Sequence, residues 1–114
     1  MELNEYQRAS SAFDVFTHGG DNVTSSAWID KVLGLGGEAG EVSDKFKKVI
    51  RDHDGVLDES VANDIVKELG DVLWYVAAIA RYMGVDLDEV ARQNIEKLTD
   101  RRNRNLIHGN GDNR

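Results

Sequence analysis

The sequence contains no cysteine and no proline. Without cysteine, the protein has no disulfide scaffold, thiolate zinc site, iron–sulfur cluster or cysteine nucleophile. Without proline, it lacks the residue that most often interrupts helices. These two absences favour a mostly helical protein whose chemistry does not depend on thiols.

Long hydrophobic runs and an excess of positive charge are lacking too. The longest apolar run, residues 72–80, covers nine residues, whereas a membrane span needs about 20. The N-terminus, Met-Glu-Leu-Asn-Glu, is acidic and polar, unlike a signal peptide. The 14 basic and 21 acidic residues give a net charge of -7, which repels a nucleic-acid backbone. We therefore expect a soluble, cytoplasmic protein that binds neither a membrane nor a nucleic-acid polymer.

The length of 114 residues, with a mass of 12.7 kDa, suits one domain. We expect this domain to cover residues 1–104, and the polar residues 105–114 to form a flexible tail. With 40% hydrophobic residues the chain can build a core, but a domain of this size is only modestly stable alone. Oligomerisation would therefore add useful buried surface.

Apolar residues recur every three or four positions, which predicts four helices. The predicted helices cover residues 4–16, 25 or 26 to 51, 58–83, and 86 or 88 to 102. Asn4 and Asp58 are suited to cap the first and third helices, and Gly84 is suited to end the third. No strand alternation, internal repeat or low-complexity segment competes with this pattern. The sequence therefore predicts an all-α protein.

Two features of the predicted helices are unusual. The second helix contains Gly34, Gly36, Gly37 and Gly40, and each glycine costs about 1 kcal/mol relative to alanine. Either the helix is broken there, or the glycines allow close approach by another helix or by a ligand. Residues 72–76 of the third helix are apolar in succession, so this helix is predicted to be buried on most sides. In so short a chain, this favours contact with a second subunit.

Four acidic residues form two pairs, Glu38 with Glu41 and Glu68 with Asp71. A spacing of three puts both carboxylates of a pair on one helical face. The pairs lie at similar distances on either side of the predicted turn at Asp54, so antiparallel helices bring them level. Facing carboxylates repel, and divalent cations neutralise them, with oxygen ligands selecting Mg²⁺ or Mn²⁺. The alternative is that all four are ordinary surface acids.

Histidine does not join these pairs. A ferritin-like di-iron site needs Glu-x-x-His motifs, and neither acidic pair contains one. The three histidines, His18, His53 and His108, lie in predicted loops or in the tail and are interpreted as solvated surface residues. The sequence therefore favours magnesium over di-iron chemistry.

Cationic and amide side chains form a stripe on the fourth predicted helix. Asn94, Lys97 and Arg101 share one face and are suited to bind phosphate oxygens. Alternatively, Lys97 and Arg101 only complement the negative end of the helix dipole. Lys45, one turn after Glu41, is either a further phosphate ligand or a solvated partner of that glutamate.

Three segments carry a recognisable pattern: residues 37–42 (Gly-Glu-Ala-Gly-Glu-Val), 67–75 (Lys-Glu-Leu-Gly-Asp-Val-Leu-Trp-Tyr) and 94–98 (Asn-Ile-Glu-Lys-Leu). Followed by Arg101, they resemble the MazG-like all-α nucleotide pyrophosphohydrolases, whose signature is an ExxE pair, a spacer and an ExxD pair. The likeness extends to the opening residues 3–7. It implies a four-helix bundle-like MazG fold in a compact single-domain member, whose core is completed by homodimerisation, with tetramers in some members.

The resemblance also implies an activity, the Mg²⁺-dependent hydrolysis of a nucleoside triphosphate to the monophosphate and pyrophosphate, with Mn²⁺ as a possible substitute. The four acids match the metal ligands of the family, and Glu38 or Glu41 is a candidate to accept the proton of the attacking water. The substrate-binding residues that it implies are Lys45, Tyr75, Asn94, Lys97, Arg101 and Trp28. Trp28 is assigned either to the nucleobase or to the core.

The resemblance does not transfer the base or sugar preference. A role in removing surplus or non-standard nucleotides from the pool is expected at the family level only. One alternative is a narrow dCTP or dUTP pyrophosphatase. Another is a helical nucleotide-binding or dimerisation module that keeps the fold but has no catalysis.

Overall fold

The computed structural model of the protein describes residues 1–16, 22–105, 109 and 111–113. These residues form no strand; their elements are α1 (Leu3–Ser10), the 3-10 helix η1 (Ser11–Phe13), α2 (Ser26–Asp52), α3 (Glu59–Tyr82) and α4 (Leu87–Asn103). The all-α prediction is confirmed. None of the described helices combines the length and the apolar character needed to cross a membrane.

Several helix ends coincide with the capping residues in the sequence. The side chain of Asp58 caps α3 by accepting a hydrogen bond of 2.9 Å from the backbone N–H of Val61. Gly84 follows α3 with a φ of +72°, the left-handed conformation that glycine adopts without strain. Helices α2 and α4 begin directly after Ser25 and Asp86. Local sequence therefore accounts for where these helices start and stop.

The first helix differs from the prediction. It begins at Leu3, and its α-helical part ends at Ser10, well before Phe16. Asn4 does not cap it, because its side chain accepts a hydrogen bond of 2.9 Å from the backbone N–H of Asp88. This contact joins α1 to the start of α4.

A buried ionic network explains why the chain leaves the helix after η1. Asp14 has an extended backbone, and its carboxylate accepts hydrogen bonds from Tyr82 (2.6 Å) and Arg81 (2.9 Å) and pairs with Lys31 Nζ at 3.0 Å. The side chains of Asp14 and Lys31 are only 3% and 1% exposed. Lys31 Nζ also lies over three aromatic rings, those of Phe16, Trp74 and Tyr82. We call these contacts the Asp14 network; they tie the segment after α1 to α2 and α3.

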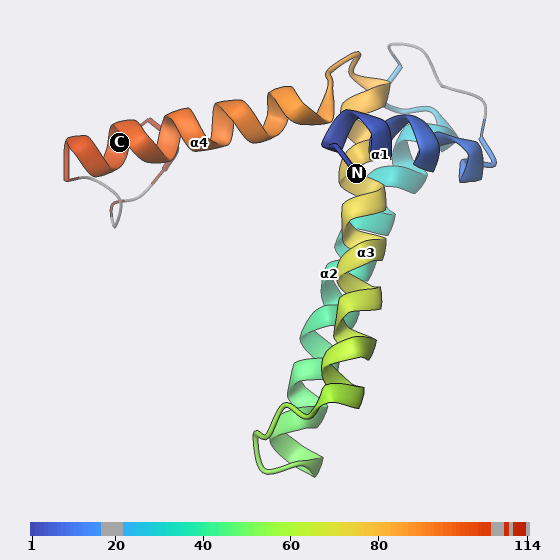
Figure 1. The fold of residues 1–114 in the computed structure, drawn as a ribbon. Coiled ribbons are helices and arrows are strands. Elements are labelled where there is room, and N and C mark those ends of the chain that lie inside the picture. The colour runs from blue at the N-terminus through green and yellow to red at the C-terminus, as the bar shows by residue number, and fades with distance from the viewer. Residues whose placement is uncertain (17–21, 106–108, 110, 114) are drawn as a thin grey trace.

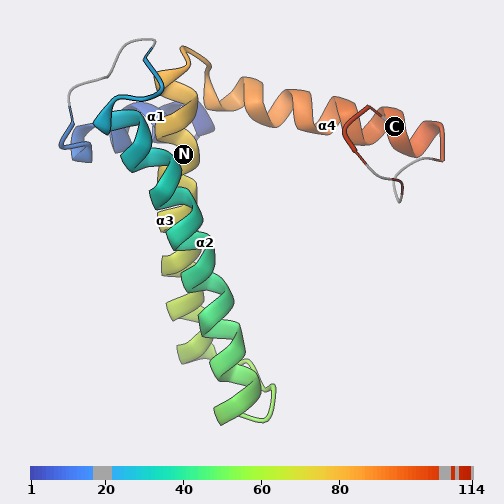
Figure 2. The ribbon, with the colours of Figure 1, turned by 180° about the vertical axis from the view of Figure 1, so that it is seen from behind.

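Helices α2 and α3 form a long antiparallel hairpin, as Figure 1 shows. The hairpin turn contains Asp54 and Gly55, both with positive φ. Helix α1 crosses the other end of α3, where Gln7 donates hydrogen bonds to the carbonyls of Ala77 and Val85. Helix α4 then points away from the hairpin, and the view from behind shows the same divergence (Figure 2). The expected four-helix bundle is therefore not closed within one chain.

Helix α2 runs unbroken through its four glycines. A Cβ atom on Gly34 would lie 2.1 Å from the ring of Tyr75, so this glycine permits a tight crossing of α2 and α3. At Gly36, Gly37 and Gly40, nothing lies within 4 Å of the position of a Cβ atom. Close helix packing thus explains the first glycine, and the other three border open space.

Much of the apolar surface of the hairpin and of α4 is exposed. The buried apolar residues are Ala27, Trp28, Val49, Ile65, Ala77, Ala78, Ala80, Tyr82 and Leu87. Large exposed apolar residues on the same helices include Leu33, Val66, Leu69 and Ile95, and Met83 directly after α3 is exposed too. The radius of gyration is 16.9 Å, whereas a compact domain of this length has about 13 Å. The single chain is therefore extended and leaves apolar surface uncovered.

Candidate metal and substrate site

The hairpin brings acids of α2 and α3 together. Glu38, Glu68 and Asp71 each offer a carboxylate oxygen, and these oxygens all lie within 4.8 Å of one another. The spacing of three in each pair and the antiparallel hairpin explain this convergence. We call these three residues the acid cluster. Its convergence agrees with the prediction for three of the four acids.

Glu41, the fourth predicted ligand, is exposed and is not part of this close group. Its charge nevertheless acts on the cluster. Burial raises the pKa of Glu38, and the negative charges of Asp71, Glu68 and Glu41 raise it further. The neighbouring acids are therefore close enough to oppose the ionisation of Glu38.

The donor chemistry of the acid cluster fits a hard divalent cation. Three carboxylates supply oxygen ligands and negative charge, which is what Mg²⁺ and Mn²⁺ prefer. Among the histidines, His53 lies exposed in the hairpin turn, and His18 and His108 fall outside the described residues. Glu38, Glu68 and Asp71 are therefore the residues that would hold a metal ion.

Lys45 contacts the acid cluster from α2. Its Nζ lies 3.6 Å from Oε1 of Glu68, with the two side chains 34% and 20% exposed. The sequence had suggested Glu41 as its neighbour on the same helix, but the structure pairs it with an acid of α3. Lys45 is therefore beside the cluster, as expected of a residue that could bind phosphate there.

A cavity of about 360 Å³ opens beside the acid cluster. Glu38 and Asp71 line it together with the aromatic side chains of Phe13, Trp74 and Tyr75. Trp74 is fixed by a hydrogen bond of 3.1 Å from its Nε1 to the carbonyl of Ser10. Tyr75 was expected near the substrate, whereas Phe13 was not singled out, because it lay inside a predicted helix with no feature to distinguish it from a core residue. Phe13 is 75% exposed, which suits a ligand contact better than a core position.

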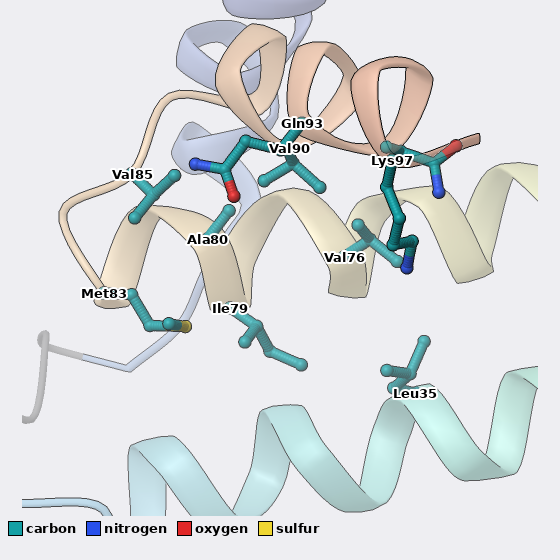
Figure 3. Close-up of a pocket in the computed structure, with 10 residues that line it drawn as sticks. Leu35, Val76, Ile79, Ala80, Met83, Val85, Val90, Gln93 and Lys97 are labelled. Carbon is teal, nitrogen blue, oxygen red and sulfur yellow. The ribbon is translucent and has the colours of Figure 1, made fainter. Parts of the chain in front are cut away.

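Asn94, Lys97 and Arg101 lie elsewhere, on α4. Asn94 and Lys97 line a separate apolar groove of about 630 Å³ between α4 and the hairpin, which Figure 3 shows with Lys97 pointing towards Val76 and Leu35. The structure therefore does not bring these three residues to the cavity lined by the acids within one chain.

The tail supplies the partners of the two α4 cations. Lys97 Nζ and Arg101 Nη2 each lie 3.1 Å from Oδ1 of Asp112, and Arg101 also donates to the carbonyl of Gly111. The Arg101 side chain is only 5% exposed, and its Nε has no hydrogen-bond partner in the described part of the chain. Part of the predicted tail thus folds back on α4, while residues 106–108, 110 and 114 lie outside the described residues.

Trp28 belongs to the core. It is 7% exposed and packs edge-on against Tyr82, with ring centroids 5.4 Å apart. Of its two assignments in the sequence analysis, the core position is therefore the one that agrees with the structure.

The chain is similar to a known domain family and to a phage protein. Residues 31–106 match the MazG nucleotide pyrophosphohydrolase domain, a stretch that contains the acid cluster and all of α4. The chain is also 41% identical to the Gene 37 protein of Mycobacterium phage L5 over 114 residues, which is the full length of both chains. No solved structure matches the chain significantly. Because the family match covers more than half of the chain, the chain belongs to the MazG nucleotide pyrophosphohydrolase domain family.

Proposed function

We propose that the protein is a Mg²⁺-dependent nucleoside triphosphate pyrophosphohydrolase that cleaves (d)NTP between its α- and β-phosphates. The observation that carries this proposal is the acid cluster of Glu38, Glu68 and Asp71 in a chain of the MazG family. Three converging carboxylates are costly unless a cation neutralises them, and a triphosphate needs the same cation to approach them. The cluster therefore supports a reaction on a metal-bound polyphosphate.

The four acids supply metal binding and proton transfer in this proposal. Glu38, Glu68 and Asp71 hold the metal ion, which when bound would polarise the phosphate and activate water for attack. Glu41 is close enough to influence Glu38, and either glutamate accepts the proton of the attacking water.

The aromatic cavity supports a nucleoside next to the metal-bound phosphates. Phe13, Trp74 and Tyr75 line the same 360 Å³ cavity as Glu38 and Asp71. Aromatic faces stack on every nucleobase, so this lining favours a broad range of bases over a single one. We assign Tyr75 and Phe13 to nucleoside contacts, and we leave Trp28 in the core.

A homodimer completes this proposal. The exposed apolar residues of α2, α3 and α4 and the extended radius of gyration leave surface for a second copy to cover. Asn94, Lys97 and Arg101 lie away from the acid cavity of their own chain, so their role as phosphate ligands depends on assembly. Pairing of two dimers into a tetramer is a further expectation, and sedimentation of the purified protein measures both. Because its substrates would be free nucleotides, we expect such an enzyme in the cytoplasm, where it would remove unwanted nucleotides.

The decisive experiment incubates the protein with a panel of ribo- and deoxyribonucleoside triphosphates, with Mg²⁺ or with chelator. We expect monophosphate and pyrophosphate, formed only when Mg²⁺ is present. Release of orthophosphate and a diphosphate would contradict the assigned bond. Comparable kcat/KM values across bases would support a broad enzyme, and activity confined to dCTP or dUTP would support the narrow alternative. If the protein binds Mg²⁺ and nucleotide but forms no product, the result would support the alternative of a non-catalytic nucleotide-binding module.

A further inference from the structure

Lys45 reaches from α2 across to the acid cluster. Its Nζ lies 3.6 Å from Glu68 Oε1, and both side chains are partly buried. Sequence spacing pairs Lys45 with Glu41, yet its partner lies on the neighbouring helix. We attribute the pairing with Glu68, instead of Glu41, to the concentrated negative charge of the acid cluster.

One lysine compensates the cluster only in part. The carboxylate oxygens of Glu38, Glu68 and Asp71 lie within 4.8 Å of one another, and Lys45 supplies one positive charge against these three negative charges. A divalent cation in the cluster would use the same Glu68 carboxylate that now faces Lys45. Because like charges a few ångströms apart repel, the ammonium group and the metal ion compete for this position.

We propose that Lys45 is an exchangeable counter-ion of the acid cluster. Glu68 pairs with Lys45 in the metal-free protein and exchanges it for a divalent cation. The freed lysine, on its long flexible side chain, then binds the phosphate chain of the substrate. The exchange itself requires only metal binding, whereas the step to phosphate rests on the proposed function. By linkage, the metal and the polyphosphate each strengthen the binding of the other.

Titration of the metal-free protein with Mg²⁺ alone tests the exchange. Lys45→Gln removes the competing charge and should bind Mg²⁺ about 3- to 10-fold more tightly than the wild type in calorimetry. Lys45→Arg keeps the charge and should bind like the wild type. Lys48→Gln is the matched control, since Lys48 lies on the same helix but pairs with Asp44 at 2.6 Å. It removes the same charge from α2 and should change the affinity by less than about 2-fold.

Equal Mg²⁺ affinities for Lys45→Gln and Lys48→Gln, or weaker binding by Lys45→Gln, would overturn the exchange. Circular dichroism of each metal-free variant verifies that it is folded. If Lys45→Gln is unfolded, Lys45→Met replaces it in the same comparison, and the same outcomes apply.

Inorganic pyrophosphate, which carries the phosphates without a base, tests the second step. At saturating Mg²⁺, Lys45→Gln should bind pyrophosphate about 5- to 10-fold more weakly than the wild type and Lys48→Gln. Equal affinities would overturn the role of Lys45 in phosphate binding. The two proposals fail separately. Tighter Mg²⁺ binding by Lys45→Gln in a protein that hydrolyses no nucleotide refutes the proposed function alone, and normal hydrolysis with unchanged Mg²⁺ affinity refutes the exchange alone.

Discussion

Two groups of carboxylates at α2 and α3 have opposite electrostatic surroundings. Asp14 contacts both helices from the segment after η1, whereas the acid cluster consists of residues of the helices themselves. Asp14 is almost fully buried and faces Lys31, Arg81 and Tyr82. Although burial opposes its charge, hydrogen bonds from Tyr82, the Phe16 backbone, Arg81 and Lys31 hold its pKa well below the usual range. The folded chain therefore stabilises this negative charge.

The acid cluster shows the reverse. Burial and the charges of neighbouring acids raise the pKa of Glu38, so the folded chain destabilises its ionised form. Among the described residues, the partly exposed Lys45 is the cation that pairs with Glu68. A compensated charge holds a fold together, whereas an uncompensated one in a cavity is ready for a ligand of opposite charge. We therefore expect the Asp14 network to stabilise the fold and the acid cluster to bind a cation.

The largest expected effect comes from the acid cluster. Asp71→Asn keeps the size of the side chain but removes a negative metal ligand, and kcat/KM for nucleotide hydrolysis should fall by about 10³-fold. The metal-free variant should be at least as stable as the wild type, because the substitution removes a repulsive charge. Steady-state kinetics and urea unfolding measure the two effects.

The matched control for Asp71→Asn is Asp64→Asn. Asp64 lies on the same helix, and its half-exposed side chain pairs with Lys67 at the surface. It should keep its activity. A large loss of stability in Asp71→Asn would assign this acid to the fold and remove the contrast with Asp14.

The next effect is on stability. Asp14→Asn leaves Lys31 buried without its full counter-charge, so the free energy of unfolding should fall by about 3 kcal/mol. Asp30→Asn is the control, since Asp30 also binds Lys31 (2.9 Å) but is 42% exposed. Its loss should cost less than about 1 kcal/mol. Urea unfolding at one protein concentration compares the variants, and equal losses would show that burial does not distinguish the two carboxylates.

A smaller effect is expected where the two regions meet. The Asp14 network fixes the chain next to Phe13, whose ring lines the cavity of the acid cluster. Phe13→Ala should raise KM for nucleotides by about 10-fold through lost stacking, and should leave the affinity for pyrophosphate unchanged. Its stability should change little, because Phe13 is 75% exposed. Val15→Ala, at a 93% exposed position nearby, is the control, and an equal rise in KM there would remove Phe13 from the site.

The regular part of this molecule could be predicted from local sequence. Helical periodicity and capping residues gave the ends of α2, α3 and α4 to within a few residues. The convergence of Glu38, Glu68 and Asp71 also follows from two local quantities, the spacing within each pair and the distance of each pair from the turn. Because both quantities are local, the candidate metal site did not require knowledge of tertiary contacts.

The remaining features depend on contacts between distant residues. Asp14 and Arg81 are 67 positions apart, so nothing in either neighbourhood indicates their pairing. Lys31 has the pattern of a surface charge on an amphipathic helix and is nevertheless buried among aromatic rings. Phe13 reaches the cavity only because the Asp14 network ends the first helix early. The direction of α4 depends on the contacts of Gln7 and Asn4 with its first turn.

The smallest expected effect separates the two regions by pH. The folded pKa of Glu38 lies above its ordinary value of 4.5, so the protonated form favours folding. That contribution is full below the unfolded pKa and is lost as the pH rises through the folded value. Asp14 behaves oppositely: its contribution is present above its ordinary value of 3.8 and is lost only as the pH falls towards its lowered folded pKa. Between pH 7 and 5, Glu38 therefore titrates more than Asp14 does.

The measurement compares the melting temperatures of wild type and Glu38→Gln from pH 7 to pH 5. Without metal, the wild type should gain stability relative to the variant as the pH falls, because protonation relieves the repulsion within the cluster. With saturating Mg²⁺ the trend should reverse, because the metal requires the ionised carboxylate and protons compete with it. Glu59→Gln, at the exposed start of α3 and nine residues before Glu68, serves as the control. If the difference in melting temperature between wild type and Glu38→Gln changes with neither pH nor Mg²⁺, the charge of Glu38 is as well compensated as that of Asp14. That result would contradict the role of the acid cluster in binding a cation.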